Sequence, residues 1–75
     1  DIDPPIVNVT TSYAGASPEI IESDITNVLE EYITGITNIK SISSSSSQGN
    51  SDITIEFKLG TNLDLAANDV RDRIG

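Results

Sequence analysis

The stretch Ser51–Gly60 reads SDITIEFKLG, and its regular alternation of apolar and polar residues predicts a β-strand. Successive side chains of a strand point to opposite faces of a sheet, so this strand has one apolar face and one polar face. The apolar face predicts core positions: Ile53, Ile55, Phe57 and Leu59. The polar face predicts outward positions: Asp52, Thr54, Glu56 and Lys58. This strand decides the fold, because the two other predicted strands pair with it.

Both partner strands lie upstream. The segment Ile6–Tyr13 reads IVNVTTSY, and the segment Asn38–Ser43 reads NIKSIS, with Ile42 as its clearest core residue. In the first of these, one face carries Val7, Val9, Thr11 and Tyr13, and the other carries Asn8, Thr10 and Ser12. The serine-rich stretch Ser43–Asn50 ends in turn residues, so we expect a flexible hairpin loop between the second and third strands. The prolines of Asp1–Pro5 predict an extended lead-in.

Two helices are predicted between and after the strands. Ser17 is a good N-cap, Pro18 suits the first helical position, and Gly35 suits the position after the end, so we expect a helix from Pro18 to about Thr34. Its apolar stripe follows helical spacing: Ile21, Ile25, Val28, Leu29, Tyr32 and Ile36. A second helix follows the cap Asn62, with an apolar face of Leu63, Ala66, Ala67, Val70 and Ile74. Its opposite face is formed by Asp64, Asn68, Arg71, Asp72 and Gly75.

The element order β-α-β-β-α predicts an α+β fold of a single domain over residues 1–75. Handedness rules for split β-α-β units place the third strand between the first and second, with both helices on one face. This is a ferredoxin-like two-layer sandwich that lacks its final strand. The first strand then has an open edge, which we expect a swapped segment or a neighbouring strand to fill. The second helix runs to Gly75 without a stop signal, so we expect a piece of a longer protein.

Composition excludes several classes of function. Cysteine and histidine are absent, so we expect no disulfide, no metal site and no cofactor. The serines of Ser43–Ser47 have no base beside them, so we expect no catalytic residues and no enzyme. A net charge of -8 with only four basic residues disfavours nucleic acid. No apolar run reaches the roughly 20 residues that span a bilayer, so we expect this piece to be soluble.

Two polar surfaces have open interpretations. The outer face of the sheet is either a solvated surface or a ligand-facing wall, and it is formed by Asn8, Thr10, Ser12, Ser43, Asp52, Thr54, Glu56 and Lys58. The polar stripe of the second helix is either exposed to solvent or part of an interface. Periodicity does not decide between these interpretations.

Four stretches of the sequence resemble the resistance-nodulation-division (RND) efflux pumps of Gram-negative bacteria. They are DIDPP, SYAGASPE, ISSSSSQGNSDITIEF and GTNLDLAANDV, and the resemblance extends over essentially the whole chain. The most similar branch is the acriflavine-resistance, or hydrophobe/amphiphile, type. One departure is Ala14, where the family usually has proline.

The resemblance implies a piece of the periplasmic porter region, its first subdomain (PN1), in an inner-membrane antiporter that uses proton influx to expel drugs. The implied partners are the rest of the pump and its trimer mates, a periplasmic adaptor, an outer-membrane channel, and amphiphilic drugs or detergents. It assigns the wall of the substrate pockets to Thr10, Ser43, Asp52 and Thr54. It assigns the helix lining the central pore to Asn62, Asp64, Asn68, Arg71 and Asp72.

Two other functions compete with this one. A free-standing ferredoxin-like ligand-binding or regulatory module would normally supply its own fourth strand. A heavy-metal pump of the same superfamily gains no support from a piece without Met, His or Cys, although its metal site would lie elsewhere.

Overall fold

The computed structural model describes residues 3–75, and Asp1 and Ile2 of the predicted lead-in lie outside the described residues. The elements run in the order β1 (Ile6–Ser12), α1 (Pro18–Ile21), the π-helical segment η1 (Glu22–Thr26), α2 (Asn27–Ile33), β2 (Ile39–Ser47), β3 (Asn50–Phe57) and α3 (Leu63–Ile74). The predicted α+β order is confirmed. Segments α1, η1 and α2 form one continuous helical stretch.

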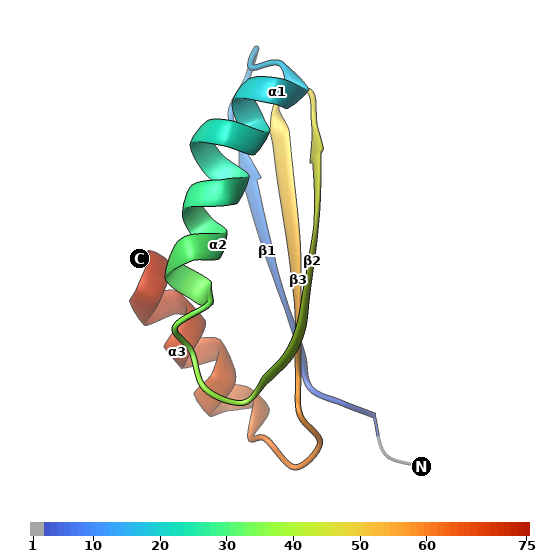
Figure 1. Cartoon of the computed structure of the whole chain (residues 1–75), viewed down its shortest axis with the longest axis vertical. Coiled ribbons are helices and arrows are strands. Elements are labelled where there is room, and N and C mark those ends of the chain that lie inside the picture. Colours follow the sequence, from blue (N-terminus) through green and yellow to red (C-terminus); the bar gives the residue numbers. More distant parts are fainter. Residues whose placement is uncertain (1–2) are drawn as a thin grey trace.

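The strands form one antiparallel sheet in the order β1-β3-β2, which confirms β3 as the central strand. Ile53 of β3 lies opposite Val9 of β1 and Ser44 of β2, and Ile55 lies opposite Val7 and Ile42. The helices lie together on one side of this sheet, and no described element covers the other side (Figure 1). The two-layer arrangement therefore leaves one sheet face open, along with the outer edge of β1.

The serine run is strand rather than loop. The expected flexible loop over Ser43–Asn50 is wrong, because β2 continues to Ser47 and pairs with β3 up to Asn50. Only Gln48 and Gly49 remain for the turn, and Gly49 supplies the positive φ of 71° that a tight turn requires. Serine side chains do not oppose this pairing, because the backbone of the run makes the ladder and the side chains alternate between the faces.

The long helix contains a π-helical turn that shifts its buried face. The backbone N–H of Asn27 donates to Glu22 O, which is the i+5 bond of a π-helix. One additional residue in this turn rotates the following helix, so Thr26 and Ile33 are buried where the regular spacing predicted Ile25 and Tyr32. The predicted stripe is correct at Ile21, Leu29 and Ile36 but wrong at Val28 and Tyr32, which are 38% and 54% exposed.

The core lies between the helices and the inner face of the sheet. It is formed by Ile33, Ile36, Ile53, Ile55, Phe57, Ala66 and Val70. Three further residues of the predicted inward faces are exposed: Tyr13, Leu59 and Leu63. Tyr13 and Leu59 follow the last residues of β1 and β3, and Leu63 is the first residue of α3, so each is at an element end that the opposite layer does not cover.

Caps and a close approach position the helices. The Ser17 hydroxyl accepts from Ile20 N and the Asn62 side chain accepts from Leu65 N, as expected for N-caps. Gly35 follows the helix end as predicted but does not adopt a left-handed conformation. Instead, Arg73 Nη2 of α3 donates to Gly35 O at 3.2 Å, and a Cβ at this position would lie 2.6 Å from Arg73 Nη1. Gly35 therefore lets α3 bond to the end of α2.

Candidate functional site

The four predicted wall residues lie together on the open face of the sheet. Strand register places Thr10 opposite Asp52, and Ser43 opposite Thr54. Asp52 and Thr54 are two positions apart on β3, so their side chains are on the same face. A shallow hollow of about 160 Å³ lies there, lined by Ser43, Ser44, Ser45, Asp52 and Thr54. The structure thus brings the wall residues into one patch, which we call the wall patch.

Asp52 is held in place by hydrogen bonds from two neutral groups. Thr10 Oγ1 donates to Asp52 Oδ1 at 3.0 Å, and Asn50 Nδ2 donates to Asp52 Oδ2 at 2.8 Å. Each carboxylate oxygen therefore has one bond from the protein and keeps capacity to accept another. A second pair runs from Thr54 Oγ1 to Asn8 Oδ1 at 3.0 Å. Hydrogen bonds thus orient the side chains of Thr10, Asp52 and Thr54 within the wall patch.

Positive charge on the open face is concentrated at the far end of β3. Among residues 3–75 the one ion pair joins Lys40 Nζ and Glu56 Oε2 at 3.7 Å, and Ser41 Oγ also donates to Glu56 Oε1. The irregularity of β2 between Ile39 and Ser41 places Lys40 in this position. Glu56 is thus partly neutralised, whereas both donors to Asp52 are neutral.

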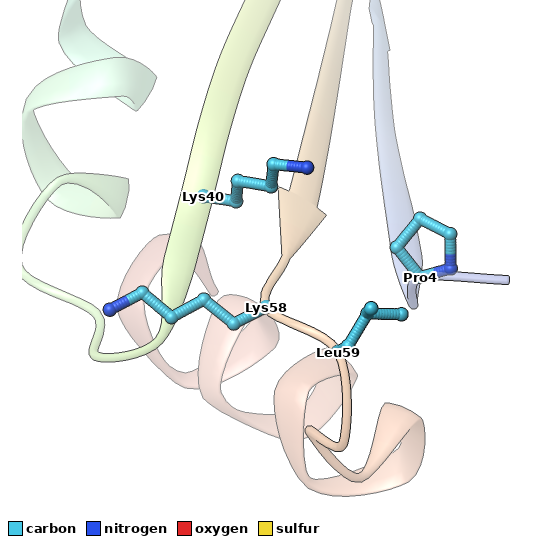
Figure 2. Close-up of a pocket in the computed structure, with 4 residues that line it drawn as sticks. All are labelled: Pro4, Lys40, Lys58 and Leu59. Atoms are coloured by element: carbon cyan, nitrogen blue, oxygen red, sulfur yellow. The ribbon is translucent and has the colours of Figure 1, made fainter. Parts of the chain in front are cut away.

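A larger hollow of about 410 Å³ lies at this end and was not foreseen from the sequence. It is lined by Pro4, Lys40, Lys58 and Leu59. Figure 2 shows Lys40 extending across β3 toward Pro4, while Lys58 extends in the opposite direction. The two ammonium groups do not converge, so the hollow offers aliphatic surface rather than an anion-binding site. The sequence pattern assigned Leu59 to the core, but β3 ends at Phe57 and Leu59 is 64% exposed.

The five predicted pore-helix residues all lie on the exposed side of α3: Asn62, Asp64, Asn68, Arg71 and Asp72. The Asn62 side chain is used as the N-cap, and Arg71 Nη2 donates to Asn68 Oδ1. Because α3 packs against the other face of the sheet (Figure 1), this stripe and the wall patch are separate surfaces. The structure does not bring the two predicted groups of site residues together.

A buried hydroxyl cluster links the helix to the sheet and was also missed. Thr26 Oγ1 lies 2.7 Å from Ser51 Oγ and 2.9 Å from Ser46 Oγ, and Ser51 is fully buried. The π-helical turn carries Thr26 to this position. The only sequence signal was the location of Ser46 and Ser51 on the inward-facing positions of paired strands, which required the strand assignment of the serine run.

Residues 3–75 offer neither a metal site nor a membrane-spanning helix. No group of three or more acidic, histidine or cysteine side chains converges on a possible metal position there. No described helix has the length and apolar character needed to cross a bilayer.

Comparisons with known proteins agree over the whole chain. A family model described as the AcrB/AcrD/AcrF family matches residues 1–75. Among solved structures, a crystal structure of a heavy metal efflux pump is similar with a TM-score of 0.94 and 32% sequence identity. The match covers 100% of this chain and 8% of the pump chain, so the sequence corresponds to a small part of that protein's length.

Proposed function

The chain belongs to the AcrB/AcrD/AcrF family of RND efflux pumps, and on this basis we propose that it is the first periplasmic porter subdomain (PN1) of a proton-driven multidrug exporter. The family match over residues 1–75 carries the proposal, and the fold agrees, since it matches part of an efflux pump at a TM-score of 0.94. In this function the piece is a non-catalytic part of a transporter that lies in the inner membrane of a Gram-negative cell.

The wall patch contributes to the substrate pocket. A multidrug pocket cannot depend on a single precise hydrogen bond, because its ligands share no common polar group. The Ser43 hydroxyl can donate to or accept from a ligand, whereas the hydroxyls of Thr10 and Thr54 donate to Asp52 and Asn8 and keep free lone pairs as acceptors. The aromatic surface of the pocket must come from other subdomains, because none of the three aromatic residues of this chain lines the hollow of the wall patch, and Phe57 faces the core. We therefore expect the isolated chain to bind drugs weakly.

The exposed stripe of α3 lines the central pore of a trimer in this proposal. A separate surface on the helix side suits this role, because the wall patch stays free for substrate while α3 contacts the trimer mates. Transport then requires the subdomain to tilt as a rigid body against its neighbours. A periplasmic adaptor and an outer-membrane channel complete the route out of the cell.

A heavy-metal exporter is the second candidate, favoured by the similarity to a heavy metal efflux pump. This chain contains no Cys, Met or His, which are the usual ligands of soft and borderline metals. Metal ligands would have to come from other parts of the protein, whereas the wall patch already offers the polar groups that an organic amphiphile needs. We therefore favour organic substrates.

The test uses the full-length gene, expressed in a Gram-negative strain that lacks its own major efflux pumps. We expect lower accumulation of amphiphilic dyes and higher detergent resistance, both lost when a protonophore collapses the proton gradient. A control variant, Ile55→Asp, places a charge at a core position that is fully buried and should abolish transport. Resistance to zinc, copper or silver without dye efflux would support the metal exporter. No resistance to either class would contradict the proposed function.

A further inference from the structure

We propose that Asp52 makes the wall patch selective for organic cations over neutral and anionic amphiphiles. This inference rests on the proposed function, because it assigns a substrate class to the same pocket. The side chain of Asp52 is exposed and lines the hollow together with Ser43 and Thr54. It is the only ionisable side chain among the five residues that line it.

The carboxylate of Asp52 is oriented before any ligand arrives. Bonds from Thr10 at 3.0 Å and Asn50 at 2.8 Å hold one oxygen each. A bound cation therefore meets a group whose rotamer is already restricted, and less conformational entropy is lost on binding. Both donors are neutral, so they fix the position of the carboxylate without cancelling its charge.

The charge of Asp52 has no counterion within the described part of the chain. The ion pair of residues 3–75 joins Lys40 to Glu56, and Glu56 is four positions along β3 from Asp52. Strand rise puts this pair about 13 Å away, beyond the roughly 8 Å over which physiological salt screens exposed charges. Lys58 lies two positions further. The wall patch therefore presents a local negative charge, in a chain whose net charge is -8.

The chemistry fits an organic cation better than a metal ion. Calcium needs six to eight oxygen ligands and magnesium needs a near-ideal octahedron, whereas one carboxylate and a few serine hydroxyls on a flat strand surface offer neither. An ammonium or phosphonium group spreads its charge over more surface and needs only one favourable electrostatic contact. Its apolar substituents would then lie toward the remainder of the pocket.

The test compares Asp52→Asn with wild type in the full-length transporter, using efflux of tetraphenylphosphonium, chloramphenicol and deoxycholate as cationic, neutral and anionic probes. An exposed ion pair gives a modest effect, so we expect efflux of the cation to fall about two- to five-fold. Efflux of the neutral probe should stay as in wild type, and efflux of the anionic probe should rise, because Asp52→Asn removes the charge that repels it. The conservative variant Asp52→Glu keeps the charge and should retain most of the cation efflux.

Glu31→Gln is the matched control, because it removes one exposed negative charge from α2, away from the wall patch. Efflux of each of the three probes by this variant should equal that of wild type. Equal loss of all probes in Asp52→Asn, or no loss of the cation, would overturn the inference while leaving the exporter intact. If wild type exports none of the three probes, the proposed function itself fails. The two failures are therefore distinguishable.

Discussion

The π-helical segment η1 makes a deletion tolerable where deletions normally destroy a helix. Ile33 follows Ile21 by twelve positions, and both are fully buried. Three turns of α-helix take about 11 residues, so a regular helix of this length would rotate Ile33 out of the core. Deleting Asp24 removes the additional residue. We expect η1 to become α-helical and Ile21, Thr26 and Ile33 to keep their buried positions.

The magnitude follows from what the deletion removes. Asp24 is exposed, and its side-chain oxygen accepts one hydrogen bond, from the hydroxyl of the adjacent Ser23 at 3.1 Å. Losing an exposed bond of this kind costs at most about 1 kcal/mol, and the regular i+4 ladder gained in exchange offsets part of it. The free energy of unfolding should therefore change by less than about 1 kcal/mol.

A matched deletion in a regular helix sets the scale. Asp69 is an exposed residue of α3, between the buried residues Ala66 and Val70. No π-helical turn is present in α3 to absorb the change, so removing Asp69 rotates one of these residues out of the core. Exposing a buried valine costs about 1.5–3 kcal/mol, and the bond from Arg73 to Gly35 is lost as well.

Thermal unfolding followed by circular dichroism compares the two deletions in the 75-residue chain. For a domain of this size, 1 kcal/mol corresponds to about 4–8 °C in Tm. The Asp69 deletion should lower Tm by about 10 °C or more, and the Asp24 deletion by clearly less. If both deletions lower Tm equally, the π-helical turn does not act by absorbing one additional residue, and the helix requires the turn itself for stability.

Two further predictions concern contacts between the layers. Thr26→Val leaves the fully buried hydroxyl of Ser51 without its 2.7 Å partner and should lower the free energy of unfolding, measured in urea, by about 1–3 kcal/mol. The double variant Thr26→Val/Ser51→Ala should recover part of this loss. A double variant less stable than Thr26→Val would contradict the pairing. Gly35→Ala should lower the free energy of unfolding by about 1 kcal/mol, because the added Cβ displaces Arg73 from Gly35 O. In an Arg73→Ala background the same substitution should be nearly neutral, and a double-mutant cycle measures the difference. An unchanged cost in that background would show that backbone freedom, not the arginine, requires glycine.

The predictable part of the fold depends on short-range signals. The alternation of Ile53, Ile55 and Phe57 identified β3, and the caps Ser17 and Asn62 located both helix starts, because each signal lies within a few residues of what it determines. The serine run could not be recognised as strand from its own composition. Its ladder partners lie across the turn on β3, and the tertiary pairing overrides the loop preference of serine.

The candidate site was partly predictable for the same reason. Once β3 was assigned, Asp52 and Thr54 had to share its outer face, and the register with β1 brought Thr10 beside them. The contacts around Thr26 could not be predicted from the sequence, because helical periodicity gives no sign of a π-helical turn. The hydrogen bonds to Asp52 were also not foreseen, since they depend on the exact side-chain positions of Thr10 and Asn50.

The five consecutive serines of β2 have a consequence for adaptation. Sliding a uniform strand by two residues replaces serine with serine, so its alignment depends on Ile42 against Ile55 and on the tight turn at Gly49. The outward serines that lie within the run, such as Ser43 and Ser45, do not contribute to that alignment. Each can mutate to a larger, charged or aromatic residue with little effect on folding. Single substitutions can therefore change the chemistry of this surface during evolution without loss of the fold.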